Sequence, residues 1–235
     1  MQVAEVMEAL EGFGSEQTRR IYTNHGVTLP IFGVKVADMK TILKKTKKDQ
    51  TLAEELFQTG NGDAMYLAAL MADEKTISAD LLDAWAQQST WYMVSEYGVA
   101  GVAAESPHGW ELGLKWIESD QENVATAGWA TLGGLVAVKK DADLDVPALQ
   151  ALLDRVRATI HQSSNRTRYT MNGFVIAVGS YVEALFDHAQ EVAAAIGKVS
   201  VNMGNTACKV PLATEYLAKI EKMGRVGKKR KMVRC

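Results

Sequence analysis

The segment STWYMVSEY, residues 89–97, gathers side chains whose types and spacing could do chemistry. On an α-helix, Trp91 and Ser95 are four residues apart and share one face. Glu96 lies about 100° further round, aligned with Tyr92. A carboxylate beside an aromatic ring suits a site where something is bound or cut. The same spacing suits a core helix with a polar edge, in which Trp91 packs a seam between helices, and the sequence leaves both interpretations open.

Basic side chains form a second candidate group in KTILKKTKK. Lys40, Lys44 and Lys47 recur at i, i+4 and i+7, on the face opposite Met39 and Leu43. Clustered cations of this kind contact the phosphates of DNA without reading its bases. A solvated helix face is the alternative interpretation.

The segment SSNRTRYTMNGF places two arginines near an expected helix start. Arg168 and Asn172 are four residues apart, so both could face one phosphate or sugar, with Arg166 and Tyr169 close by. Alternatively, these side chains tie neighbouring helices together by bonding loop carbonyls. The two interpretations are equally compatible with the sequence.

Cysteine and histidine give no sign of a metal site. Cys208 precedes Pro211, which is expected to open a helix, so its thiol is either reactive or a small buried hydrophobe. Cys208 and Cys235 have neither the spacing nor the ligand count of a zinc site. The sequence has no P-loop, GxGxxG, GxSxG or HExxH motif. We therefore predict no metal and no cofactor.

Composition indicates a soluble globular protein, with 47% hydrophobic and 23% charged residues among 235. Apolar stretches such as AMYLAALMA are shorter than the roughly 20 residues of a membrane helix. The first residues do not read as a signal peptide, and two distant cysteines favour a reducing cytoplasm. The expected location is therefore cytoplasmic, with no membrane contact.

Charge is distributed unevenly along the chain. The last eleven residues, RVGKKRKMVRC, carry six basic side chains and no acid, so a formal net charge of −2 leaves −8 on the rest. We predict one domain over residues 1–224 and a flexible basic tail over 225–235. Within the tail, Lys228, Lys229 and Arg230 are candidate nucleic-acid contacts, with a disordered solubilising end as the alternative.

Apolar spacing is helical nearly everywhere and no alternating strand pattern is convincing. Ser78 is expected to begin one helix, and Ser119 with Glu122 forms a capping-box pattern for another. The pattern predicts eleven or twelve helices joined by short turns, hence an all-α class. A long series of such helices suggests a HEAT-like solenoid of antiparallel pairs, and a compact irregular bundle is the alternative.

Five segments, in order over about residues 30–182, resemble the DNA alkylation repair family, whose best-known members are the HEAT-like repeat glycosylases called AlkD. They are PIFGVKVADMKTILKK, GDAMYLAALMAD, STWYMVSEY, GLKWIESDQENVATAGWATL and RTRYTMNGFVIAVGSYV. The resemblance implies a HEAT-like all-α solenoid and a DNA partner, double-stranded and in some cases alkylated. The chain's end, with MGNTACKVP and the basic tail, indicates a branch distinct from AlkD.

The family's chemistry starts from a purine made cationic by alkylation, which weakens its glycosidic bond. An aspartate near the sugar then stabilises the developing positive charge, flanked by two tryptophans and an arginine. By resemblance, the first tryptophan falls on Trp91, the aspartate on Ser95, the second aromatic on Phe174 and the arginine on Thr126. Serine and threonine carry no charge at neutral pH, so this branch departs from the AlkD pattern at two of four positions.

Three functions follow as expectations. The first is a DNA-binding repair-type protein that uses Lys40, Lys44, Arg166, Arg168 and the tail, with Trp91 and Phe174 on the lesion-facing surface. The second is an alkylpurine DNA glycosylase whose carboxylate is Glu96, in a pocket built on Tyr92 and Glu96. The third is a scaffold that binds another protein.

Overall fold

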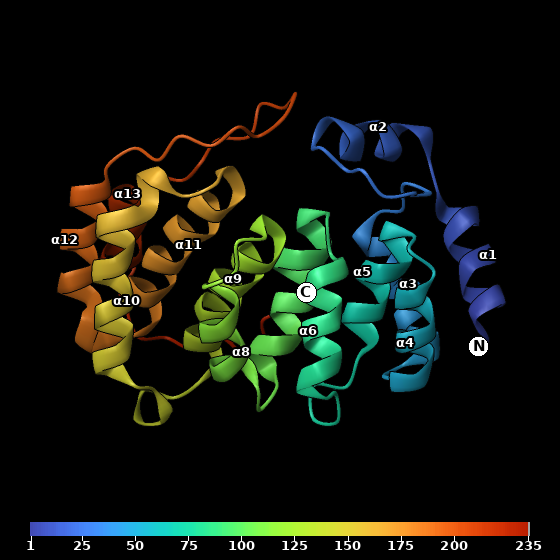
Figure 1. Cartoon of the computed structure of the whole chain (residues 1–235), viewed down its shortest axis with the longest axis horizontal. Coiled ribbons are helices and arrows are strands. Elements are labelled where there is room, and N and C mark those ends of the chain that lie inside the picture. Colours follow the sequence, from blue (N-terminus) through green and yellow to red (C-terminus); the bar gives the residue numbers. More distant parts are fainter. Residues whose placement is uncertain (235) are drawn as a thin grey trace.

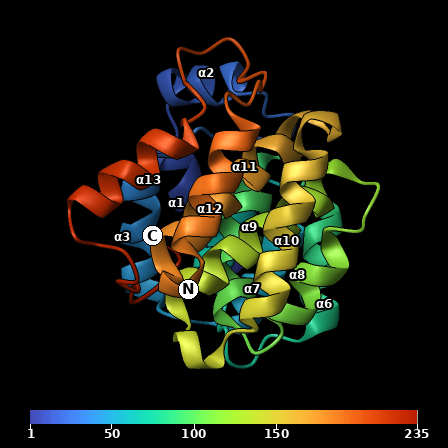
Figure 2. The ribbon, with the colours of Figure 1, turned by 90° about the vertical axis from the view of Figure 1, so that its left-hand side faces the viewer.

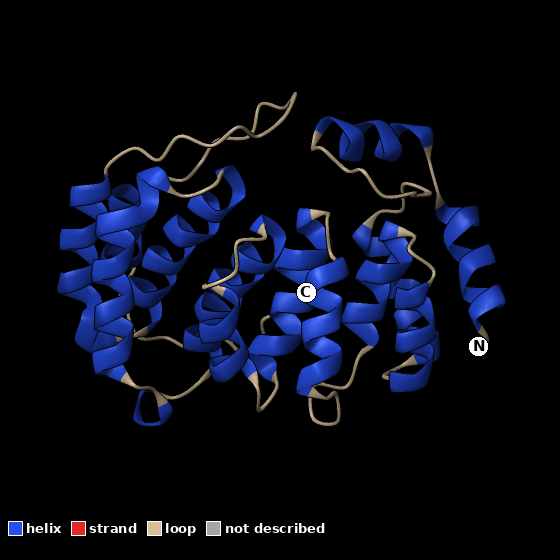
Figure 3. Ribbon diagram, viewed as in Figure 1, coloured by secondary structure: helices blue, strands red, loops and turns tan. Residues whose placement is uncertain are grey.

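The computed structural model describes residues 1–234, and that range contains helices and no strand (Figure 3), which confirms the all-α class. Its α-helices are α1 Val3–Phe13, α2 Glu16–Asn24, α3 Val36–Thr46, α4 Gln50–Gln58, α5 Gly62–Met71, α6 Ala79–Gln88, α7 Ala100–Glu105, α8 Gly109–Trp116, α9 Glu122–Val138, α10 Val146–Thr159, α11 Asn165–Tyr181, α12 Phe186–Ile196 and α13 Ala213–Lys222. Single turns of 3₁₀-helix are η2 Asp141–Asp143, η3 Ile160–Gln162 and η4 Glu183–Leu185.

The helices form two rows that run across the molecule from α1 to α12 (Figures 1 and 2). The inner row consists of α5, the π-helix η1 Met93–Val99 with α7, then α9 and α11, each packed on the next. The outer row, α4, α6, α8, α10 and α12, packs against the inner row. This pairing is the antiparallel solenoid that the series of short-turned helices predicts.

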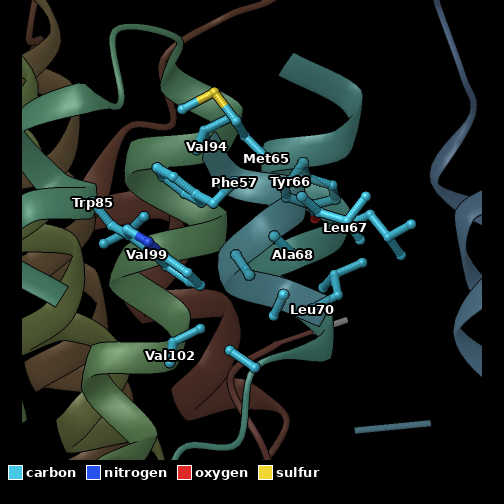
Figure 4. Packing of buried hydrophobic residues seen from close by; sticks show 14 of the residues in the cluster. Phe57, Met65, Tyr66, Leu67, Ala68, Leu70, Trp85, Val94, Val99 and Val102 are labelled. Carbon is cyan, nitrogen blue, oxygen red and sulfur yellow. The ribbon is translucent and has the colours of Figure 1, made fainter. Parts of the chain in front are cut away.

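Among the inner helices, α5 is buried on every side because neighbours surround it. All ten residues of α5 are buried, including its alanines. Around it, Phe57 and Trp85 stack face to face with ring centroids 4.2 Å apart (Figure 4). No helix among the described residues has the length and apolar character needed to cross a membrane.

One of the two predicted helix starts is confirmed. Ser78 caps α6, and its hydroxyl accepts a hydrogen bond from the Leu81 amide at 3.2 Å. The capping box at Ser119 is wrong, because α9 begins only at Glu122, and the Ser119 hydroxyl instead accepts from the Gln121 amide. The polar turn before α9 satisfies its own amides, so the helix starts later.

Asp63, near the start of α5, holds the loop that joins α2 to α3. Its buried carboxylate accepts hydrogen bonds from the amides of Phe32, Gly33 and Val34 at 2.7, 2.9 and 3.1 Å. Gly33 has a φ of 80°, a conformation that favours glycine. A side-chain anion thus replaces secondary structure as the partner of three consecutive amides.

Residues 225–234, here called the strap, cross the carboxyl ends of the inner helices. The Gly227 amide donates to the carbonyl of Ser180 in α11, and the Arg230 amide donates to Ala137 in α9. The Lys229 ammonium donates to Val136, also in the last turn of α9. The last carbonyls of a helix lack partners and carry partial negative charge, so a basic segment is a favourable cover for them.

Arg234 anchors the strap in the middle of the molecule, where the chain returns in Figure 1. Its buried guanidinium donates to Glu105 at 2.8 Å, to Glu74 at 2.5 Å, and to the carbonyls of Ala69 and Ala72 at 3.0 and 2.7 Å. Four acceptors therefore surround one cation.

The sequence predicts a flexible tail, whereas the contacts of residues 225–234 hold that segment on the body. The acidic side chains and helix ends that it meets explain the difference. Gly101 also makes room, since a Cβ there would lie 2.8 Å from Cγ of Arg234. Cys235 lies outside the described residues.

Candidate functional site

The segment STWYMVSEY forms a π-helix rather than an α-helix. Tyr92 precedes η1, Met93–Val99, which continues into α7. The hydrogen bonds of a π-helix run from i to i+5, so each turn holds more residues than an α-turn, and such segments are frequent at functional sites. The faces expected for Ser95 and Glu96 from α-helical spacing therefore shift.

Trp91 belongs to the core and does not face a ligand surface. It is 1% exposed and its ring lies 5.0 Å from that of Tyr22. The backbone of Gly62 lies against its ring, since a Cβ at that glycine would come within 3.1 Å. The expectation of a lesion-facing Trp91 is thus wrong, and the seam alternative describes its position.

Glu96 and Arg166 form a two-pronged ion pair at the centre of the site. Nε of Arg166 donates to Oε1 of Glu96 at 2.8 Å, and Nη2 donates to Oε2 at 2.5 Å. The Glu96 side chain is 2% exposed and that of Arg166 is 19% exposed. Both carboxylate oxygens are therefore occupied by one guanidinium, contributed by the amino end of α11.

Two tyrosines flank the same guanidinium. Its central carbon lies 4.7 Å from the ring centroid of Tyr92 and 4.4 Å from that of Tyr169. These distances are within the range of cation–π attraction. Tyr92 and Glu96 thus meet at one cation, which places the two residues of the predicted Tyr92–Glu96 pocket together.

Burial controls the electrostatics of the pair. It raises the pKa of Glu96 to about 7, although the two bonds from Arg166 act in the opposite direction. Glu122 adds a smaller rise, and its Oε1 accepts the backbone amide of Arg166 at 2.7 Å. Desolvation therefore raises the pKa of the Glu96 carboxyl, and the Arg166 guanidinium opposes that rise.

Ser95 and Thr126, the positions matched to the family's aspartate and arginine, do converge. Together with Glu96 and Arg166 they line a small cavity of about 50 Å³. Both are buried, and each hydroxyl donates to a carbonyl of its own chain four residues earlier, Trp91 for Ser95 and Glu122 for Thr126. Neither side chain supplies a charge to the cavity.

Phe174 lines a different and larger cavity, of about 380 Å³, which also reaches Glu96 and Tyr97. Its ring is 1% exposed and packs edge-on against Trp129 with centroids 5.2 Å apart. The sequence predicts that Phe174 faces a lesion, and the structure shows that it borders this cavity. We call it the tyrosine cavity, since its lining includes Tyr66, Tyr97, Tyr169, Tyr181 and Tyr216.

The remaining predicted contacts are scattered. Lys40 and Lys44 are exposed on α3, which lies towards the opposite end of the molecule from α11 (Figure 1). Arg168 is partly buried, and its Nε has no hydrogen-bond partner among the described residues. Asn172 donates to the loop carbonyl of Pro211 at 3.0 Å, as the structural alternative for this segment predicts.

The strap residues divide into two kinds. Lys229 is paired with Asp141 at 2.6 Å and is thereby occupied. Lys228 and Arg230 are exposed, and neither has an ion-pair partner within the described part of the chain. Only these two of the three predicted tail contacts are free to meet a ligand.

A loop after α12 closes over the top of the inner row. The Asn205 amide donates to the carbonyl of Asn24 at the end of α2, at 3.0 Å. Asn165 and Asn202 exchange two hydrogen bonds at the loop's base, of 2.9 and 2.7 Å. Beneath this arch lies a cavity of about 550 Å³ that Tyr92, Arg166 and Tyr169 also line.

The same loop carries Cys208, which is exposed. It borders the cavity beneath the arch together with its neighbour Lys209. The prediction that Cys208 is a small buried hydrophobe is therefore wrong. No group of three or more histidine, cysteine, aspartate or glutamate side chains that could hold a metal ion occurs within residues 1–234.

Comparison with known proteins decides the family. The model of the DNA alkylation repair enzyme family matches residues 6–217. The chain belongs to this family. Two relatives, the uncharacterized proteins Lin0241 of Listeria innocua and Lmo0209 of Listeria monocytogenes, are each 34% identical over 216 residues, which cover 89% of this chain and 93% of theirs.

A solved structure extends the comparison to the whole fold of this DNA alkylation repair family member. It comes from a new family of proteins related to the HEAT-like repeat DNA glycosylases with affinity for branched DNA structures. The two chains are 39% identical, cover each other completely and superpose with a TM-score of 0.92. The predicted HEAT-like solenoid is thus confirmed.

Within the family fold, the sequence interpretation missed the partners rather than the positions. It selected Glu96 and Arg166 separately, as a catalytic group and a DNA contact, whereas the two bind each other. It also missed Glu122 and Tyr97, and it treated the strap as a free end. The net charge of −8 on the rest of the chain, noted beside the basic tail, was the available signal that the two would meet.

Proposed function

We propose that this protein binds DNA with a branched structure and does not excise alkylated bases through a free carboxylate. The observation that carries this proposal is the occupied Glu96: both its oxygens accept from Arg166. A group that stabilises positive charge on a sugar must face that sugar, whereas Glu96 is 6% exposed. The affinity for branched DNA reported for the related family supports the choice of ligand.

Phosphate contact falls to the exposed cations. Lys40 and Lys44 on α3, and Lys228 and Arg230 on the strap, are exposed. Two predicted contacts, Arg166 and Lys229, are already paired with Glu96 and Asp141. The double-stranded arms of a junction present phosphates in several directions, which suits cations placed on separated elements.

Binding is tested by fluorescence anisotropy with a four-way junction, a three-way junction and a linear duplex of equal length. We expect tighter binding to the junctions and a steep loss of affinity with salt. Substituting Lys40 and Lys44 by alanine should lower the salt slope by about one per lost phosphate contact. The exposed Lys75, changed to alanine, is the control, and salt-insensitive or absent binding overturns the proposal.

A second candidate, an alkylpurine glycosylase that uses Glu96, is favoured by one observation. The pKa of Glu96 is raised to about 7 by burial, and this carboxyl borders the tyrosine cavity. Its test is the release of 3-methyladenine and 7-methylguanine from methylated duplex DNA. We expect no release above the protein-free control, whereas release that Glu96→Gln abolishes would establish this candidate instead.

A further inference from the structure

The tyrosine cavity has the size and setting of a binding site. Its volume of about 380 Å³ is within the range of small-molecule pockets. It lies on the inner row, bordered by α9 and α11, and is closed by α13 and the strap. Tyr66 of α5 and Tyr97 of η1 also line it, so six separate elements converge on one concavity.

Aromatic rings form its walls. Tyr97 and Tyr216 are 47% and 45% exposed, so their rings are available at the opening. Deeper in the cavity, Trp129 and Phe174 pack edge to face. Gly173 also lines the cavity, and an added Cβ there would meet nothing within 4 Å, so the space beside it is open.

Polar groups at the cavity are few. Asn172 lies among its lining residues but is 1% exposed, and its Nδ2 donates to the carbonyl of Pro211. Arg230 borders the cavity and is exposed, without an ion-pair partner in residues 1–234.

We propose that this cavity receives an unpaired nucleobase of the bound DNA, by stacking on Tyr97 and Tyr216, with Arg230 contacting the adjoining phosphate. The inference rests on the proposed DNA-binding function and specifies what the protein recognises at a branch. Each nucleotide joins a flat base to a phosphate, which matches the exposed rings and the unpaired Arg230 cation. Branch points are where bases are most easily left unpaired and unstacked.

The test uses a three-way junction with one unpaired adenine at the branch, and the same junction with an abasic tetrahydrofuran at that position. Base–aromatic stacking contributes about 1–3 kcal/mol, so the wild type should bind the adenine junction roughly 5- to 150-fold more tightly. The double variant Tyr97→Ala with Tyr216→Ala should lose this preference. Tyr97→Phe with Tyr216→Phe should keep it, because stacking needs the ring and not the hydroxyl.

Phe13→Ala is the matched control, since Phe13 is 42% exposed on α1 and does not line the cavity. Thermal melting verifies that each variant is folded. Equal affinity of the wild type for both junctions, or a preference retained by the alanine variant, overturns the base site while leaving DNA binding intact. Absence of binding to either junction refutes the proposed function itself, and the base site with it.

Discussion

At the scale of single residues, the site is organised by one buried cation. Arg166 binds both oxygens of Glu96 and lies between Tyr92 and Tyr169. A buried ion pair contributes modestly as a unit, because desolvation offsets most of its attraction, but neither partner tolerates the loss of the other. The pair therefore fixes how α11 meets the π-helix η1.

This asymmetry gives a stability prediction. Arg166→Met should lower the free energy of unfolding by about 3–5 kcal/mol, because Glu96 is left buried without a partner. Adding Glu96→Gln should restore most of that loss. Urea denaturation near neutral pH measures both. Arg155→Met is the control, since Arg155 pairs with a largely exposed Glu118 and should cost about 0–1 kcal/mol.

The prediction fails if Arg166→Met is no more harmful than Arg155→Met, or if the double variant is as unstable as the single one. Sequence alone could align Glu96 with Tyr92, because residues four apart are neighbours on an α-helix. It could not supply Arg166 as the partner, since 70 positions separate the two and only the packing of α11 on the inner row joins them. The π-helix was also out of reach of α-helical spacing.

At the scale of elements, Asp63 of α5 supplies the hydrogen-bond acceptors that a strand or helix would otherwise provide. Asp63 accepts from three consecutive amides and so fixes the loop that leads into α3. Helix existence was predictable here because apolar residues recur at helical spacing. The partner of the loop was not predictable, because a short polar turn has no periodicity. In the sequence, Asp63 also looks like an ordinary acidic residue in the first turn of a helix.

Asp63→Ala should therefore destabilise the protein by about 3 kcal/mol or more, since each buried amide left without a partner costs about 1–3 kcal/mol. Asp80→Ala is a matched control, because Asp80 is also the second residue of its helix, α6, but is exposed. Its loss should cost at most about 1 kcal/mol, the usual helix-dipole contribution. Thermal unfolding compares them, and equal midpoints would contradict the role assigned to Asp63.

At the scale of the whole molecule, the strap links parts of the chain that a solenoid normally leaves independent. Repeat proteins make contacts mainly between neighbouring repeats. Here Arg234 contacts Ala69, Ala72, Glu74 and Glu105, up to 165 positions away. Helix lengths and short turns predicted the array of helix pairs, but only complementary charge pointed towards this long-range closure.

The strap should respond to acid in a defined direction. Burial alone would raise the pKa of Glu74, but the Lys48 hydrogen bond and the charges of Arg234 and Lys48 lower it to about 2, from an ordinary 4.5. A lowered carboxyl pKa stabilises the fold above pH 4.5, and this contribution is lost as pH falls towards 2. Glu74→Gln should therefore reduce stability at neutral pH and flatten its decline below pH 4.5.

Glu55→Gln, an exposed change on α4, serves as the control for that pH series and should leave the profile unaltered. Circular dichroism melts at several pH values measure the profile.

Deleting residues 225–235 should destabilise the fold as well as weaken DNA binding, because it removes the cover of the helix ends and the partner of two carboxylates. A truncated chain with unchanged stability would show that the strap contacts do not contribute to the free energy of unfolding.

The position of Arg234 also bears on the order in which the protein matures. A chain emerging from the ribosome folds from its amino end, and its early repeats can pair as they appear. The acceptors at Ala69, Ala72, Glu74 and Glu105 are made long before the arginine that fills them. Until residue 234 is made and docks, the nascent solenoid therefore holds an unfilled acidic pocket at the carboxyl ends of α5 and α7.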